Sequence, residues 1–429
     1  MPIKFELTTD RLTRRAGMVI VNEFGNRIEL QKSIDTAFGR PGSNRGLKAS
    51  DYIQTLVDMF IDGALSLEDV RSLEWDDAYK TLIERDAYPS SDAIGDWLRR
   101  HGGRDGERRL WHAMADVLTL NTDSDLTLDI DTTLIEADKG DATMSYKGIR
   151  GYQPLLGTIA SNGLIVGSEF RFGNESPQSN LARFIRQCER HFPNRIATIR
   201  SDSAAYNAEV INECMDRERP LRFTITADQD SAVLGMVSKI PQNEWKRGVN
   251  ADGAAANWEV AETVHTMEHT KHSFRLVVKR TEDHRQIDLF QGDHYRYWIV
   301  ASDIPEEELD ANGVILFHQQ RGEMERQIGE LKNHFNLDHL PCGQFDANAL
   351  YFTTGILAYN IVQLIKQVAL GADWMKKSIR TLRYRLFHLS AKVISHARYL
   401  IVRIACVPAW FEQFLSAHAK VRYAPLAPS

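Results

Sequence analysis

The sequence has few cysteines, no long apolar run and no apolar segment near its start. Its 429 residues include four scattered cysteines and no CxxC pair, which argues against a disulfide scaffold and against a zinc ribbon. No stretch reaches the roughly 18 apolar residues of a membrane span. The opening residues, MPIKFELTTDRLTRR, lack the apolar core of a signal peptide. We therefore expect a cytoplasmic protein with no membrane partner.

An excess of positive charge is also missing, because the formal net charge is −6. The charge is unevenly distributed, however, and residues 375–403 contain eight basic residues and no Asp or Glu. A run of one sign indicates a surface that faces phosphates, and a solvated helix face is the plainer alternative. The basic residues are Lys376, Lys377, Arg380, Arg383, Arg385, Lys392, Arg398 and Arg403.

Hydrophobic periodicity divides the chain into five segments. Residues 1–120 have the 3.6-residue pattern of helices, and residues 121–243 alternate strand and helix patterns in the manner of a mixed α/β sheet. Residues 244–303 are β-rich. Residues 304–370 and 371–429 have helical patterns, with long helices expected over Glu306–Phe335, Ala347–Leu370 and Met375–Cys406.

Acidic residues lie within and after two of the predicted strands. Asp129 and Asp131 are separated by one residue in the strand 126–135, so both side chains point to one face of the sheet. Asp202 follows the strand 195–201, at a strand end where open α/β sheets place their sites. A carboxylate in an apolar strand is expensive to bury unpaired. Two or three of them suit Mg²⁺ or Mn²⁺, although a single Asp is more often salt-bridged or a helix cap.

A further acid lies on the predicted helix 306–335. At about 100° per residue, Arg321, Glu325 and Lys332 lie on one face together with His318. Apolar residues occupy a second face, so the helix can pack on a core and still present these charged side chains. Taken alone, this pattern is also that of a solvated charged face.

These motifs together resemble the DDE transposases of the IS4-like insertion-sequence superfamily, and most closely the IS1380 family. That superfamily carries Tyr, two residues, Arg, three residues, Glu, six residues, Lys, and the sequence has Arg321, Glu325 and Lys332 at this spacing. His318 stands at the Tyr position. The segments Asp129-Ile-Asp131-Thr-Thr and Arg200-Ser-Asp202-Ser also resemble the family, and the resemblance covers nearly the whole chain.

The resemblance implies an RNase H-like catalytic core with a β-rich insertion, and a helical N-terminal region that binds DNA ends. It implies that Asp131, Asp202 and Glu325 hold Mg²⁺ or Mn²⁺, with Asp129 as the rival for the first position. It also implies contacts from His318, Arg321 and Lys332 to the backbone of double-stranded DNA, at the terminal inverted repeats and at the target. The family acts as a homodimer in a synaptic complex in the bacterial cytoplasm. For the basic run we expect phosphate contacts from Lys376, Lys377, Arg380, Arg383 and Arg385.

Two other activities remain open at this point. One is a metal-dependent nuclease of the same fold without strand transfer, and the other is a DNA-binding derivative without catalysis. A zinc site at His265, His269 and His272 is disfavoured, because those residues fall in a strand and loop pattern. Trp245, Trp258 and Trp298 could stack on an extruded base, but core packing is the more common role of such residues.

Overall fold

The nine-stranded sheet is built around the strand that carries Asp129 and Asp131. The computed structural model describes residues 1–42, 46–119, 125–282 and 295–423. Contact density divides the chain into two units, which we describe separately: unit 1 contains residues 1–122, 134–152 and 328–429, and unit 2 contains residues 123–133 and 153–327. The predicted boundary near residue 121 lies outside the described residues.

The sheet of unit 2 has the strand order β10-β11-β12-β13-β9-β8-β2-β6-β7. Strands β2, β8 and β9 are parallel, whereas β6 and β7 form an antiparallel hairpin beside β2. This confirms the predicted mixed α/β core of RNase H-like topology. The core strands are β2 (Leu126–Thr132), β6 (Leu155–Ile159), β7 (Ile165–Glu169), β8 (Ile196–Ser201) and β9 (Arg222–Thr226).

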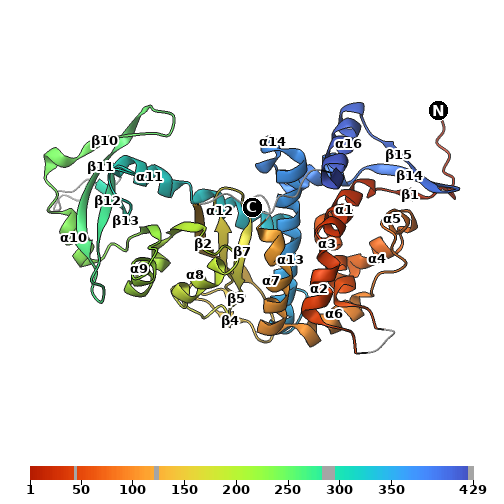
Figure 1. The fold of residues 1–429 in the computed structure, drawn as a ribbon, viewed down its shortest axis with the longest axis horizontal. Helices are drawn as coiled ribbons and strands as arrows, with labels where there is room; N and C mark the ends of the chain where they lie inside the picture. The colour runs from red at the N-terminus through yellow and green to blue at the C-terminus, as the bar shows by residue number, and fades with distance from the viewer. Residues whose placement is uncertain (43–45, 120–124, 283–294, 424–429) are drawn as a thin grey trace. The chain divides into compact units, whose positions relative to one another are not determined.

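The β-rich segment continues this sheet. Strand β13 pairs antiparallel with β9, with Val300 opposite Thr226, and the long strands β11, β12 and β13 run side by side (Figure 1, green). Trp258 is buried in the apolar cluster between these strands and the helix that follows them, which agrees with the core-packing role. The four strands are β10 (Lys246–Val249), β11 (Ala255–Thr266), β12 (Ser273–Glu282) and β13 (Tyr295–Ser302).

Helices α8 and α9 contact each other and pack on this sheet. Helix α8 approaches β6 and β7 closely because the cross-strand pair beneath it consists of Gly157 and Gly167. A Cβ added at Gly167 would lie 2.5 Å from the Sγ of Cys188. The helices of unit 2 are α8 (Leu181–Glu189), α9 (Ala208–Met215), α10 (Ser231–Val237) and α11 (Ala311–Gln319).

The variant Gly167→Ala is therefore expected to lower the free energy of unfolding by about 1–3 kcal/mol, the usual range for overpacking a core. Thermal or urea denaturation measures this change. The control is Gly235→Ala, on α10, where an added Cβ meets nothing within 4 Å and a helix gains from the replacement. Equal stabilities of the two variants would contradict the close approach of α8.

Unit 1 is helical and is organised around α13 (Phe345–Ile365). This helix is apolar on all sides and buried along nearly its whole length, as expected for the central helix of a bundle. It contacts α1 (Val19–Arg27), α3 (Ala49–Asp62), α6 (Ser91–His101) and α7 (Gly103–Leu118). The other helices at the N-terminal end are α2 (Leu30–Phe38), α4 (Val70–Glu74) and α5 (Asp77–Leu82).

Local sequence signals account for the ends of two of these helices. The Ser90 side chain accepts a hydrogen bond from the backbone N–H of Ala93 at the start of α6. Gly63 follows α3 with φ = 94°, a left-handed conformation that favours glycine. A small sheet of β3 (Ile135–Glu136), β5 (Arg150–Tyr152) and β4 (Thr143–Met144) completes this part of unit 1.

Two of the predicted long helices are wrong. The segment 306–335 forms α11 and α12 (Gly322–His334), separated by a turn at Gln320 and Arg321. Residues on either side of this turn therefore do not share one helical face. In the sequence, Gly322 marks the position of the break.

The predicted helix Met375–Cys406 is instead two short helices followed by a β-hairpin, so the C-terminal region is not purely helical. The residues 391–404, AKVISHARYLIVRI, are rich in β-branched residues with period-two alternation, which favours strands. The hairpin pairs with an N-terminal strand in the order β1-β14-β15 (Figure 1). The elements are α14 (Ala372–Met375), α15 (Ile379–Leu382), β14 (Ser390–His396), β15 (Tyr399–Ala405), α16 (Pro408–Tyr423) and β1 (Leu12–Thr13).

Candidate active site

Asp129 is fully engaged by a buried arginine on the neighbouring strand. Asp129 on β2 lies directly opposite Arg200 on β8, and the Nε and Nη2 atoms of Arg200 donate to its two carboxylate oxygens over 2.6 and 2.8 Å. Both side chains are 2% exposed. Arg200 also donates to the backbone carbonyl of Phe317 at the end of α11. The pair therefore joins two strands and a helix in the core.

Asp131 points to the same side of the strand, as predicted, but is only partly buried. One oxygen accepts a hydrogen bond of 2.8 Å from the backbone N–H of Thr132. The other oxygen accepts from Nη1 of Arg321 over 3.0 Å. Arg321, in the turn between α11 and α12, is thus the cation that balances Asp131 in this structure.

The other two predicted acids lie near Asp131. Asp202 follows β8 and begins a short 3-10 turn, where its carboxylate accepts from the N–H of Ala204 over 3.1 Å. Glu325 lies in the first turn of α12 with its side chain exposed. The carboxylates of Asp202 and Glu325 both act electrostatically on Asp131. The three acids thus come from β2, from the end of β8 and from α12.

The surroundings of Asp131 disfavour its charged form. Burial raises the pKa of the Asp131 carboxyl to about 6, Arg321 opposes this shift, and the negative charges of Asp202 and Glu325 add to it. A carboxylate whose pKa stays high beside an arginine is incompletely compensated. An additional cation at this position would stabilise the ionised form.

The donor chemistry of the three acids suits a hard divalent cation. Carboxylate oxygens are the ligands that Mg²⁺ and Mn²⁺ prefer. Within the described ranges, no three His, Cys, Asp or Glu side chains are already arranged to hold a metal ion. Asp131 and Asp202 instead use their oxygens for local hydrogen bonds and for Arg321.

His318 does not share a face with Arg321, contrary to the prediction. Its ring is 2% exposed, and its two nitrogens lie 2.9 Å from the hydroxyls of Thr224 and Thr226 on β9. Burial, with Arg321 and Arg200 nearby, lowers the pKa of His318 to about 3, so the ring is neutral at physiological pH. In this position His318 ties α11 to β9, and both of its ring nitrogens contact threonine hydroxyls.

The basic side chains of unit 1 divide into buried and exposed ones. Arg383 is mostly buried and donates to the backbone carbonyls of Phe60, Ile61 and His334, so its role is structural. Nζ of Lys332 donates to the carbonyl of Leu134 over 2.8 Å. The exposed residues on or beside α14 and α15 have no acidic partner within the described part of the chain: Lys376, Lys377, Arg380 and Arg385.

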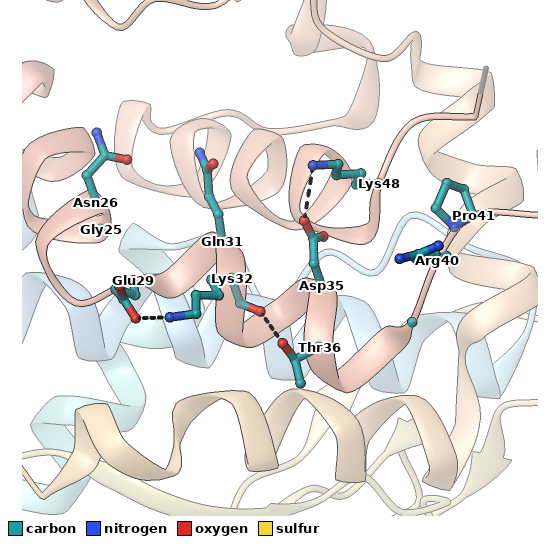
Figure 2. Close-up of a pocket in the computed structure, with 11 residues that line it drawn as sticks. Gly25, Asn26, Glu29, Gln31, Lys32, Asp35, Thr36, Arg40, Pro41 and Lys48 are labelled. Atoms are coloured by element: carbon teal, nitrogen blue, oxygen red, sulfur yellow. Dashed lines mark hydrogen bonds and ion pairs between the residues drawn. The ribbon is translucent and has the colours of Figure 1, made fainter. Parts of the chain in front are cut away.

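Other hollows and clusters do not compete with this site. A hollow of about 620 Å³ on unit 1 is lined by charges that largely balance. Lys32 pairs with Glu29, and Lys48 lies 3.9 Å from Asp35; Figure 2 shows these residues. His272 pairs with Asp216. Trp298 is half-buried with its ring 5.5 Å from that of His318.

The sheet order and the acids on β2, after β8 and on α12 define an RNase H-like α/β protein with a candidate acidic site. Comparison with known families is more specific: the chain belongs to the family described as Transposase DDE domain group 1, which matches residues 1–426. The protein is therefore a DDE-type transposase.

Among solved structures, the fold is similar to the piggyBac transposase in a cryo-EM structure of its synaptic complex with hairpin DNA. The TM-score is 0.45 with 14% identity, over 89% of this chain and 83% of that one. A comparison with curated proteins finds no match. The helices in the part of the chain that the structure describes include none with the length and hydrophobicity of a membrane span.

Proposed function

We propose that this transposase belongs to the IS4-like superfamily, nearest the IS1380 family. It would cut DNA at the terminal inverted repeats of an insertion sequence and join the ends to a target. The observation that carries the proposal is the position of Asp131. It is paired with Arg321 and interacts electrostatically with Asp202 and Glu325. We further propose a homodimer in the synaptic complex and action in the bacterial cytoplasm.

Asp131, Asp202 and Glu325 would hold the divalent ions, Mg²⁺ or Mn²⁺. Bound at such a site, these ions supply Lewis acidity at the phosphodiester and a nucleophile at neutral pH. We assign the first position to Asp131, because both oxygens of Asp129 are occupied by Arg200. Asp129 then acts as a positioning residue that fixes β2 against β8.

The reaction needs no covalent enzyme intermediate. In the first step a water oxygen bonds to phosphorus and the DNA 3′-oxygen leaves as a hydroxyl. In the second step that hydroxyl oxygen bonds to a target phosphorus, and the target's own 3′-oxygen leaves. Arg321 would exchange Asp131 for a DNA phosphate, to which an arginine forms strong charge-assisted hydrogen bonds. Lys332 and the exposed Lys376, Lys377, Arg380 and Arg385 would provide further phosphate contacts.

The variant Glu325→Gln tests the assignment. It is expected to reduce Mg²⁺-dependent cleavage of a terminal-repeat duplex by at least about a hundredfold, since even a lost outer-shell partner of a metal ligand costs 10–100-fold. The matched control is Glu323→Gln, an exposed residue of the same helical turn that pairs with Arg326, and it should cleave normally.

Each outcome separates the alternatives. Full cleavage by Glu325→Gln would remove Glu325 from the site. Cleavage without joining to target DNA by the unmodified protein would favour the nuclease, and binding without cleavage would favour the inactive derivative.

A further inference from the structure

The three-stranded sheet of unit 1 has two chemically different faces. On one face, Ala391, Val393, Val402 and Ile404 turn inward, and the first two are almost fully buried. This apolar face borders a hollow lined by residues of α1 and α16, by Glu23 and Glu84, and by His396, Arg398 and Tyr399 at the turn end of the hairpin. The hairpin thus packs on the body of the unit through this apolar face.

The opposite face is more exposed, and we call it the ribbon face: Lys392, Ile394, His396, Tyr399, Ile401 and Arg403, together with Arg398 in the turn. Lys392 lies directly across from Arg403. A like-charge pair in this position destabilises a hairpin. At the turn, the rings of His396 and Tyr399 lie 5.4 Å apart, and Tyr399 is 62% exposed.

Few negative charges compensate the ribbon face. Lys392 pairs with Asp10 over 2.7 Å, and both side chains remain substantially exposed. Arg398 and Arg403 are exposed and have no acidic partner in the part of the chain that the structure describes. A hollow beside Lys392 and Arg403 is also lined by Arg14, which pairs with Asp62, by Asp76, which pairs with Arg15, and by Trp75, which is 78% exposed. The surface therefore combines several cations with exposed aromatic rings.

We propose that the ribbon face is a second DNA-binding surface, on which β14 and β15 contact the phosphates that border one groove of a duplex. Charge complementarity selects the duplex, because Lys392 and Arg403 place one cation on each strand of the ribbon, Arg398 adds a third at the turn, and Asp10 is the acid that pairs with this set among the described residues. The dimensions agree, because a two-stranded ribbon fits the roughly 12 Å width of the major groove. This inference rests on the proposed function, which makes DNA the substrate, and it places contacts on a hairpin of unit 1, whereas the acidic site belongs to unit 2.

A purely protective role for these charges is the competing explanation. Strand β15 lies at the edge of its sheet, and charged residues on an edge strand prevent pairing with another chain. In that case, removal of Arg403 would promote self-association and leave DNA binding unchanged.

The test measures the affinity of the full chain for a labelled terminal-repeat duplex by fluorescence anisotropy, in EDTA, between 50 and 200 mM salt. Each phosphate contact contributes about −0.9 to the slope of log affinity against log salt. Lys392→Ala/Arg403→Ala is therefore expected to reduce the magnitude of the slope by about 2 and to weaken binding by on the order of tenfold to a hundredfold. Arg403→Lys should retain the slope.

The matched control removes the same charge elsewhere on unit 1. Lys32→Ala/Arg71→Ala deletes two exposed cations that pair with Glu29 and Glu68, and its slope should equal that of the unmodified protein. Thermal unfolding establishes that each variant is folded.

The outcomes separate the ribbon from the proposed function. An unchanged slope in the folded Lys392→Ala/Arg403→Ala variant overturns the ribbon proposal. If light scattering also shows that this variant forms new dimers, the charges are assigned to protection of the edge strand. A reduced slope supports the ribbon even if the unmodified protein fails to cleave, in which case the cleavage proposal alone falls. An unmodified protein that binds no duplex overturns both.

Discussion

Asp131→Asn is expected to abolish Mg²⁺-dependent cleavage and, at the same time, to make the metal-free protein more stable at pH 8. The folded protein raises the pKa of Asp131 from 3.8 to about 6, so it binds this proton more tightly than the unfolded chain does. Ionised Asp131 therefore destabilises the fold above pH 6, by roughly 1–3 kcal/mol. The neutral amide removes that penalty together with the proposed metal ligand.

The pH dependence of this effect distinguishes it from a simple packing change. The gain in stability should be complete above pH 6 and should disappear as pH falls toward 4, where Asp131 is protonated in the folded protein and increasingly in the unfolded chain. Denaturation with urea at pH 8 and near pH 4 measures it. The exposed Asp86→Asn is the control and should change neither stability nor cleavage. A destabilised Asp131→Asn protein at pH 8 would mean that Arg321 compensates the carboxylate fully.

Asp129→Ala is expected to have the opposite effect on stability, namely a large decrease in the free energy of unfolding. It leaves the Arg200 guanidinium buried and without its carboxylate, and breaking a buried ion pair costs about 3–5 kcal/mol. Chemical denaturation of the metal-free protein measures this loss. Cleavage per folded molecule should fall much less than in Asp131→Asn.

A double variant separates the ion pair from the chemistry. Burial raises the pKa of Asp129 despite the opposing hydrogen bonds from Arg200, so the pair stabilises the fold little relative to apolar residues. Asp129→Leu/Arg200→Met should therefore recover most of the lost stability. If the stable double variant loses metal binding as completely as Asp131→Asn does, Asp129 must be reassigned as a metal ligand.

The strands of the catalytic core could be predicted because their alternation is strong and their environment is regular. From Leu126 onward, apolar residues alternate with polar or small ones, as in a half-buried strand. This alternation correctly places Asp129 and Asp131 on the same side. The choice between them could not be made locally. It depends on Arg200, which lies 71 residues away in the chain and pairs with Asp129 only because β8 lies beside β2.

Other features were missed where one signal concealed another. Lysines and arginines dominate residues 375–403, and their charge concealed the period-two pattern of the hairpin. A helical angle calculated from His318 ignored Gly322, so a buried histidine was placed on the same face as Arg321. Burial of His318 depends on Thr224 and Thr226, nearly a hundred residues earlier in the chain, and no local pattern reports it.

The division of the chain also determines the order in which it can fold during synthesis. Nearly all of unit 2 lies within one stretch that ends at Gln327, whereas the N-terminal helices of unit 1 pack on α13 and on α16, which come later. At 5–20 residues per second, the roughly 100 residues from Gln327 to the end of α16 take about 5–20 s to synthesise. During that interval the N-terminal helices expose the apolar surfaces that α13 will cover. A nascent chain at this stage is the form that needs chaperone protection most, and the acidic site can take shape before the ribbon face exists.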